Sequence, residues 1–394
     1  MHNTNNIIKL SIGVIVLIAL AIGSFVVIKT LYINSSFNSS KSASTPGISS
    51  AEEVTPTPNP NAELYDAFPG IVFWGDSQTV GSGGDGVNFP DVVRKLINTQ
   101  IVSKYNPELN YDHVVNQGIC GEDSLTLAGR SGGMPFVLAN DVTIPSDTSK
   151  VQIEFRSTNG EYVCPMHDEP VSIQGITGIL SSENASRRDK QNNVYYFNRI
   201  KEGEETVLKA GDEIVYPEST AYRRYVQVLF IGQNGTFKDT DELIEQLTTM
   251  VNRQTNKNKR YIIIGTHTGT TEKNQETEEK MEAAFGKHYI NLREYMSTEA
   301  LEDAGIEPCA KDSRGVSNGR APISFKSGFV HFNSVGYALL GNLVYERCEK
   351  LGYLNKLKKK CGITEKDTSS PEVALEGIDV ESVVAKSREL FGTE

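Results

Sequence analysis

Short apolar runs alternate with segments of helical periodicity along much of this chain, and this alternation limits the fold more than any other feature. Residues 71–74 and 261–264 are runs of large side chains without a charge, as expected of strands buried on both faces. Helical spacing of apolar residues follows the first run and begins after Pro90, a residue that fits a helix's first turn. The pattern predicts an α/β fold with a doubly wound parallel sheet.

The other elements of this sheet follow from the same two patterns. Further strands are expected at residues 113–115, 225–231 and 289–292, and helices are expected at residues 92–101, 244–251 and 334–351.

The region between the second and third strands has no helical period. Residues 151–155, 171–173, 194–197 and 213–216 alternate apolar with polar side chains and are separated by Gly-containing turns. We therefore predict an inserted antiparallel β-module of about five to seven strands over residues 134–222. Such a module is either an elaborated lid or a surface that grips a polymer, and the sequence favours neither.

The N-terminal region differs from the rest in composition. Residues 10–28 form an uncharged apolar run, which as a helix would span roughly 28 Å, close to the thickness of the hydrocarbon core. A cleaved signal peptide has a shorter apolar region and a small-residue cleavage site. We expect residues 1–33 to be an uncleaved transmembrane signal anchor, with the N-terminus inside and the remaining chain outside.

The segments that flank the expected globular region are polar. Residues 34–67 are rich in Ser, Thr, Pro and Asn up to residue 62 and are predicted to form a flexible tether. Residues 356–394 are predicted to be a C-terminal tail, in which an amphipathic segment at 380–391 either packs on the body or stays loose.

Charge and cysteine content exclude several classes of function. The net charge of −11 argues against nucleic acid or anionic lipid as the main partner. The cysteines show no zinc-binding spacing, so no metal or cofactor is predicted, and their odd number excludes a complete set of intrachain disulfides. They are Cys120, Cys164, Cys309, Cys348 and Cys361. A low cysteine content, combined with a membrane anchor and a Pro/Thr-rich tether, is typical of a bacterial surface protein.

A serine stands where the first strand ends. Gly75, Asp76 and Ser77 follow the run at 71–74, and the carboxyl ends of parallel strands are where such sheets bind ligands. A serine hydroxyl needs a base to become a nucleophile. Of six histidines, His331 is the best candidate, since it lies in a loop directly before the helix at 334–351.

Two other strand ends carry residues that can donate hydrogen bonds. Gly118 and Gly121 follow the second strand, where a glycine lets the main chain approach a ligand. Asn234 follows the third strand within Gly232-Gln233-Asn234-Gly235, and an asparagine amide can stabilise an oxyanion. Each is by itself an ordinary turn signal; together they place a nucleophile, two donors and a base at one edge of the sheet.

In this order, Gly75-Asp76-Ser77, Gly121, Asn234 and His331 resemble the four sequence blocks of the SGNH (GDSL-type) hydrolase superfamily. The similarity covers residues 69–122 and 225–354, including the ending with Gly336-Tyr337. It implies a three-layer α/β/α, flavodoxin-like hydrolase domain formed by residues 68–133 and 223–355.

The resemblance also implies the role of each residue. Ser77 would be the nucleophile and His331 the base, while the Ser77 and Gly121 N–H groups and the Asn234 side chain would form the oxyanion hole. Gly121 is preferred to Gly118 because an acidic residue follows it. Asp76, Gly232 and Gly328 would belong to the supporting loops.

One position departs from the family pattern. The family commonly has an aspartate three residues before the histidine, whereas this chain has Gly328 there and no carboxylate in residues 326–331. Three interpretations remain open: a backbone carbonyl orients His331 in a Ser-His dyad, a distant acid such as Asp303 or Asp312 folds back, or catalysis is impaired. We prefer the dyad, because any nearby carbonyl can serve.

These observations lead to the expectation of an extracytoplasmic, membrane-tethered serine esterase or acetyl-esterase. Its substrate would be an acylated small molecule or, more specifically, an acylated carbohydrate or cell-wall glycan. The alternatives are an acyltransferase with the same nucleophile and a catalytically impaired glycan-binding protein. The sequence gives no indication of the oligomeric state.

Overall fold

The computed structural model describes residues 61–363 and 375–394. The predicted anchor at 1–33 and most of the predicted tether lie outside these ranges. Within them, no helix combines the length and the apolar character needed to cross a membrane.

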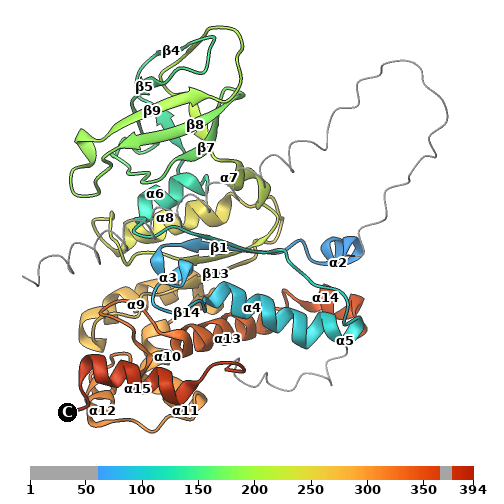
Figure 1. Cartoon of the computed structure of the whole chain (residues 1–394), viewed down its shortest axis with the longest axis vertical. Helices are drawn as coiled ribbons and strands as arrows, with labels where there is room; N and C mark the ends of the chain where they lie inside the picture. Colours follow the sequence, from blue (N-terminus) through green and yellow to red (C-terminus); the bar gives the residue numbers. More distant parts are fainter. Residues whose placement is uncertain (1–60, 364–374) are drawn as a thin grey trace, which may run out of the picture. The chain divides into compact units, whose positions relative to one another are not determined.

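A five-stranded parallel sheet forms the centre of the fold (Figure 1). Its strands are β1 (Ile71–Gly75), β2 (Val114–Gly118), β12 (Val226–Phe230), β13 (Tyr261–Ile264) and β14 (Tyr289–Ile290). They lie in the order β14-β13-β12-β1-β2, with every neighbouring pair parallel. All five strands were placed by the sequence patterns, and the predicted α/β class with a parallel sheet is confirmed.

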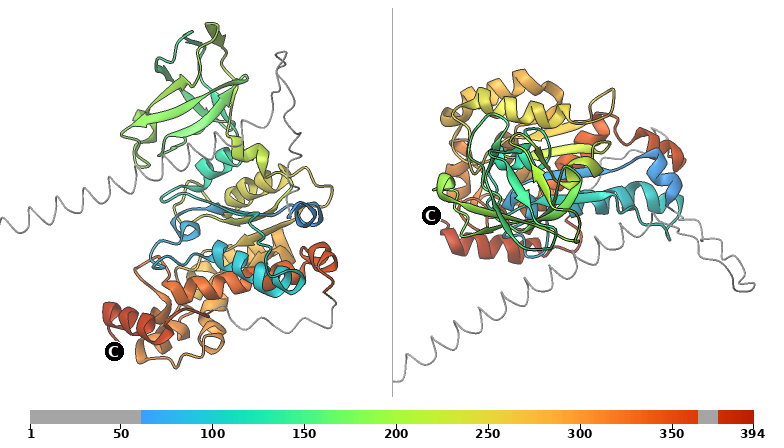
Figure 2. Two further views of the ribbon diagram at one scale, coloured as in Figure 1. Left: turned by 45° about the vertical axis from the view of Figure 1, so that its right-hand side comes forward. Right: turned by 90° about the horizontal axis from the view of Figure 1, so that it is seen from above.

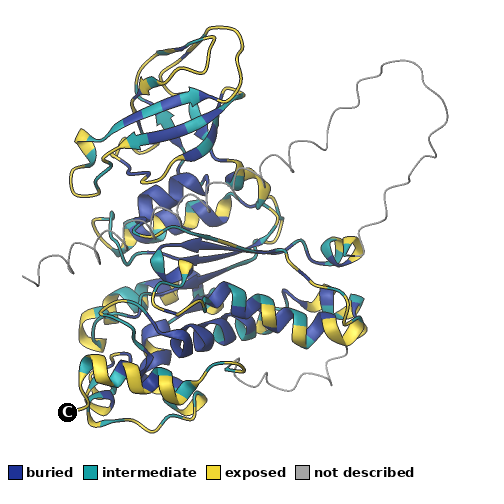
Figure 3. Ribbon diagram, in the orientation of Figure 1, coloured by how far each residue is buried: buried dark blue, intermediate teal, exposed yellow. Residues whose placement is uncertain are grey.

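Helices cover both faces of this sheet, because strand β1 sends alternate side chains to opposite sides. Ile71 and Phe73 belong to one buried cluster and Val72 and Trp74 to the other, so the strand is dark blue throughout in Figure 3. The first cluster includes residues of α4 (Phe89–Ile97), α10 (Leu292–Thr298) and α13 (Ser334–Lys350). The second includes residues of α6 (Ser124–Arg130), α8 (Thr240–Asn252) and α9 (Thr271–Phe285).

Shorter elements complete the body of the protein. They are α3 (Ser77–Val80), a π-helical turn (Asn98–Val102), α5 (Ser103–Tyr105), α7 (Pro217–Ala221), α11 (Ala300–Asp303) and α12 (Ala310–Ser317).

An antiparallel module lies between β2 and β12 in the chain, as predicted. Seven strands form its sheet in the order β5-β9-β8-β7-β11-β3-β6, and β4 and β10 form a separate pair. Their bounds are β3 (Phe136–Leu138), β4 (Val142–Ile144), β5 (Val151–Ile153), β6 (Phe155–Ser157), β7 (Glu169–Ile173), β8 (Ile176–Glu183), β9 (Val194–Arg199), β10 (Thr206–Leu208) and β11 (Glu213–Val215).

The alternation at 151–155, which predicted a single strand, belongs to two. Strand β5 pairs with β9 at one edge of the sheet, while β6 pairs with β3 at the other. Only Glu154 separates β5 from β6 in the chain, so the two edges of the sheet meet. The chain thus passes directly from one edge strand of the sheet to the other, and each of these two strands pairs on one side only.

Both ends of the chain's described part carry more structure than predicted. Residues 62–67, which we assigned to the tether, form the short helix α2 (Ala62–Ala67), drawn in blue in Figure 2. Its Leu64 is buried. The tail contains α14 (Asn355–Lys360) and α15 (Val380–Phe391). Helix α15 packs on the body, where Ser387 Oγ accepts a 2.8 Å hydrogen bond from Asn333 Nδ2.

The contact of α15 with the body can be tested at Arg388. Its guanidinium lies 3.2 Å from the fully buried carboxylate of Asp312. We expect Arg388→Met to lower the free energy of unfolding by about 1–3 kcal/mol, since the carboxylate loses its charged partner. Urea denaturation measures this loss. The control is Lys386→Met, which alters an exposed residue of the same helix; equal effects of the two changes would contradict the predicted role of α15.

Candidate active site

Ser77 begins helix α3 directly beyond the end of β1. Asp76 caps this helix, because its Oδ1 accepts a 2.9 Å hydrogen bond from the N–H of Gln78. Gly75 allows the tight turn: a Cβ there would overlap Thr79 Oγ1 and lie 2.6 Å from the carbonyl oxygen of Phe230. Only a glycine therefore lets the serine-bearing helix sit so close to the sheet.

The structure brings the predicted nucleophile and base together. Nε2 of His331 lies 2.9 Å from Oγ of Ser77, although 254 positions separate the two residues in the chain. Both side chains are half-buried. Burial lowers the pKa of His331 below its ordinary value of 6.5, so the imidazole is neutral and able to accept a proton at neutral pH.

The loop that carries His331 is held as a tight hairpin. Lys326 and Phe332 form an antiparallel bridge, and the N–H of Ser327 donates a 3.1 Å hydrogen bond to the carbonyl of His331. At the tip of the loop, Phe329 is 90% exposed. The residues next to His331 are thus fixed by backbone contacts rather than by burial.

A second set of contacts holds this loop from the serine side. The side-chain amide of Gln78 donates to the carbonyl of Val330, and Tyr337 Oη donates a 3.0 Å hydrogen bond to Gln78 Oε1. Gln78 and Tyr337 are both fully or almost fully buried. Gln78, the residue after Ser77, therefore positions Val330, the residue before His331.

Neither distant acid reaches His331, so that interpretation of the missing aspartate is wrong. Asp312 accepts hydrogen bonds from Ser324 and pairs with Arg388, and Asp303 accepts from Tyr295. Nδ1 of His331 has no hydrogen-bond partner in the described ranges. The preferred interpretation, in which a backbone carbonyl accepts the Nδ1 proton, is therefore also wrong for this structure.

Two of the predicted oxyanion-hole donors are backbone N–H groups without an acceptor. Over residues 61–363 and 375–394, no acceptor pairs with the N–H of Ser77 or of Gly121. Gly121 has a φ of +78°, a conformation that favours glycine. The alternative donor, Gly118, gives its N–H to Asn116 Oδ1 at 2.9 Å. These contacts favour Gly121 over Gly118 as the donor at the end of β2.

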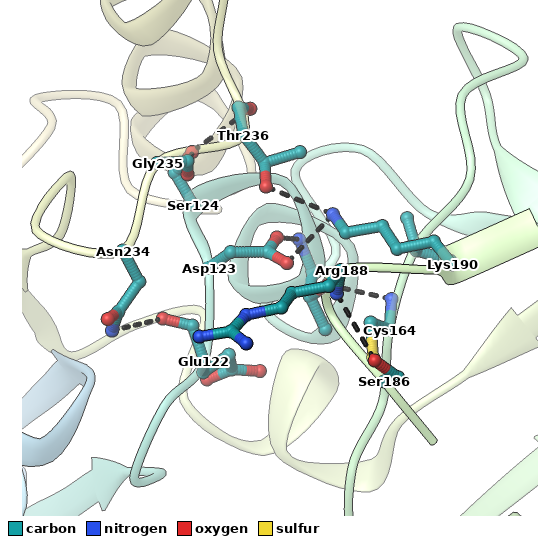
Figure 4. A network of polar contacts seen from close by, with 12 residues as sticks. Glu122, Asp123, Ser124, Cys164, Ser186, Arg188, Lys190, Asn234, Gly235 and Thr236 are labelled. Atoms are coloured by element: carbon teal, nitrogen blue, oxygen red, sulfur yellow. Dashed lines mark hydrogen bonds and ion pairs between the residues drawn. The ribbon is translucent and has the colours of Figure 1, made fainter. Parts of the chain in front are cut away.

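Asn234 lies at the site, but its amide protons are already engaged. Its Nδ2 donates to Asp76 Oδ2 at 2.8 Å. It also donates to the carbonyl of Glu122 at 3.0 Å, the contact drawn in Figure 4. An amide nitrogen has two protons, so a further acceptor must displace one of these partners. Asn234 thereby ties together the segments that follow β1, β2 and β12. Gly232, which precedes it with a φ of +114°, provides the turn.

A buried ion pair fixes the segment that carries Gly121. The guanidinium of Arg130 binds both carboxylate oxygens of Glu122, at 2.9 and 2.6 Å, and the carbonyl of Gln117 at 2.7 Å. Arg130 also lies 5.1 Å from the centre of the Trp74 ring. Burial raises the pKa of Glu122, and the charge of Arg130 opposes this rise.

The carboxyl group of Asp76 is also perturbed. Burial raises its pKa to about 6, while the N–H of Gln78 and the charge of Arg187 act in the opposite direction. Asp76 is therefore ionised at neutral pH, as its two hydrogen bonds from Gln78 and Asn234 require.

No group of three or more His, Cys, Asp and Glu side chains suited to a metal ion occurs in the described ranges. All five cysteines are free thiols there, and Cys164, Cys348 and Cys361 are buried.

Sequence reasoning missed the residues that hold the site in place. Gln78 and Tyr337 stand one and six residues after Ser77 and His331, yet neither type signals a positioning role by itself. Arg130 was not identified because its partner Glu122 lies in the loop before α6, and no sequence pattern pairs the two residues. Arg187 lies in the β-module, which was expected to be a lid or a binding surface, but no pattern in its sequence singles out this residue.

Comparison with known proteins gives no independent information about this site. The chain matches no protein-family model, no curated protein and no solved structure. The interpretation of the site therefore rests on its residues and their contacts.

Gly328 offers a test of how His331 is oriented. A Cβ at this position meets nothing within 4 Å, and the residue does not have a positive φ. We expect Gly328→Asp to fold normally and to raise the pKa of His331 by about one unit, since a nearby carboxylate favours the imidazolium. NMR titration of the histidine resonances measures this pKa. Gly328→Asn is the uncharged control, and equal pKa values in both variants would contradict the prediction.

Proposed function

We propose that this protein is a serine esterase of the SGNH (GDSL-type) hydrolase superfamily. The observation that carries the proposal is the 2.9 Å contact between Nε2 of His331 and Oγ of Ser77. A neutral imidazole at this distance can remove the hydroxyl proton, which is the requirement for a serine nucleophile.

The arrangement of the sheet supports this assignment. Numbered along the chain, the five parallel strands have the order 2-1-3-4-5, the flavodoxin-like order. In such sheets ligands bind beyond the carboxyl ends of the strands, where the order reverses, here between β1 and β12. Ser77 follows β1 and Asn234 follows β12, so the candidate residues flank the expected binding position.

The contacts support a mechanism in two steps. His331 Nε2 takes the Ser77 proton while Oγ attacks the ester carbonyl, and the N–H groups of Ser77 and Gly121 stabilise the resulting oxyanion. The intermediate then expels the alcohol, which receives the proton from His331 and leaves an acyl group on Ser77. Water, deprotonated by His331, hydrolyses this acyl-enzyme and restores the serine.

Asn234 takes part only after one of its hydrogen bonds is exchanged. Its contact with Asp76 Oδ2 is the candidate for this exchange, because Asp76 keeps its helix-capping bond to Gln78 through the other oxygen. The catalytic contribution of Asn234 is therefore conditional on substrate binding.

The proposed substrate is an acylated carbohydrate, such as a cell-wall glycan, and the proposed location is the outer face of a membrane. The location rests on the sequence of residues 1–67, and the substrate class rests on this location together with the family resemblance. An acyltransferase would share the acyl-enzyme and differ only in the acceptor.

A catalytically impaired glycan-binding protein is the second candidate. Two observations favour impaired catalysis: the amide protons of Asn234 are engaged, and Nδ1 of His331 has no partner in the part of the chain that the structure describes. The glycan-binding role rests on the sequence alone.

Hydrolysis of p-nitrophenyl acetate separates the two candidates. We expect Ser77→Ala and His331→Ala to lower kcat/KM by about 10³-fold or more, since each removes a group that acts only in catalysis. Ser317→Ala, an exposed change on α12, is the control and should retain full activity. Equal rates for wild type and both site variants would overturn the esterase proposal and favour the glycan-binding protein.

The pH dependence gives an independent prediction. Because burial lowers the pKa of His331, we expect kcat/KM to rise with pH along a limb whose midpoint lies below 6.5, as the imidazolium loses its proton. Steady-state rates across this range measure the midpoint. A midpoint above neutral pH would contradict the assignment of His331 as the base.

A further inference from the structure

The β-module sends a cationic loop to the candidate active site. This loop, residues 186–190, carries Arg187 and Arg188, which are both exposed. Neither guanidinium has a hydrogen bond or an ion pair within the residues that the structure describes. Unpaired arginines are common on protein surfaces, so their meaning depends on what lies beside them.

Arg187 lies beside the backbone donor at the end of β2. The Cζ and Nε atoms of its side chain would be 3.8 and 3.9 Å from a Cβ placed on Gly121. The Sδ atom of Met166, from the same module, would be 3.8 Å from this point. The charge of Arg187 also acts on the carboxyl group of Asp76, the residue before the nucleophile. The guanidinium is therefore next to the reacting centre.

Ionic and polar contacts hold the loop at this place. Nζ of Lys190 lies 2.8 Å from the carboxylate of Asp123, which is 1% exposed, and 3.0 Å from Oγ1 of Thr236 (Figure 4). Asp123 follows Gly121 by two residues, and Thr236 follows Asn234 by two. Lys190 thus links the loop to both donor-bearing segments, and Arg187 and Arg188 are the cations of the loop that have no ion pair within the described residues.

From this geometry we infer that Arg187 binds an anionic group of the ester substrate. The inference rests on the proposed esterase function and narrows its substrate to esters that carry a carboxylate or a similar oxyanion near the scissile bond. A planar guanidinium suits such groups because it can donate two parallel hydrogen bonds. For a carbohydrate substrate, the matching class is an acylated acidic glycan. Arg187 is then a specificity-determining residue that the inserted module supplies.

Two pairs of esters with and without a charge test this inference. 4-Acetoxybenzoate carries a carboxylate on its leaving group, and its methyl ester is the neutral partner. 4-Nitrophenyl succinate carries a carboxylate on its acyl group, and 4-nitrophenyl butyrate is the neutral partner. We expect Arg187→Gln to lower kcat/KM about 10- to 100-fold for the anionic member of at least one pair, as expected for the loss of a charge-assisted hydrogen bond. The neutral members should change by less than about twofold.

Salt dependence provides a second readout on the wild-type chain. The preference for the anionic ester should shrink as ionic strength rises from about 0.01 to about 1 M, because the screening length falls from roughly 30 to roughly 3 Å. Lys150→Gln removes a cation of the same module that lies beside Tyr196. This control should keep the preference unchanged.

The outcomes distinguish this inference from the esterase proposal. Hydrolysis of the neutral esters that depends on Ser77 but shows no selective effect of Arg187→Gln would overturn the anion site alone. Loss of activity on all four esters in Arg187→Gln would also overturn it, since the residue would then have a general role.

Binding can be measured without turnover. In the Ser77→Ala chain, calorimetry should show tighter binding of the anionic ester than of its neutral partner, and Arg187→Gln should abolish the difference. Equal affinities with and without Arg187 would overturn the inference whether or not the protein is an esterase.

Discussion

The candidate site depends on one steric constraint, the lack of room for side chains beneath helix α3. Gly75 and Gly118 are paired in register on neighbouring strands. A Cβ on Gly118 would lie 2.7 Å from the backbone nitrogen of Val80, and a Cβ on Gly75 would overlap Thr79. The short helix therefore rests directly on a pair of glycines, and Ser77 at its start is placed at the edge of the sheet where His331 and Asn234 arrive.

The way in which His331 is held differs from that of a Ser-His-Asp triad. In a triad a carboxylate orients the imidazole and stabilises its positive charge. Here a backbone hairpin and the buried Gln78 fix the position of the loop, but neither compensates the charge that the imidazole acquires. The site thus fixes the position of His331 without providing a group that stabilises its positive charge. Burial lowers the pKa of His331, and no carboxylate among the described residues opposes this shift.

The sequence predicted the parts of the structure that depend on local pattern. Apolar runs identified all five parallel strands, and residues at their ends identified Ser77, Gly121 and Asn234. What it missed depends on tertiary contacts. These are the change of strand partner at Glu154, the hydrogen bonds that occupy both amide protons of Asn234, and the position of Arg187 beside Gly121. Alternation over 151–155 is the same whether a strand keeps one partner or changes it, so periodicity cannot detect the break.

The inserted module enters and leaves through paired strands, since Phe136 of β3 lies opposite Ile214 of β11. Its two junctions with the body are consequently neighbours, and the parallel sheet does not need to open to accommodate it. Insertions are tolerated where the ends of the inserted segment lie close together. The parallel sheet that holds Ser77 and the inserted module can therefore diverge at different rates. Under the proposed function, changes in the loop at 186–190 would alter which ester is preferred, while the strands that hold Ser77 stay as they are.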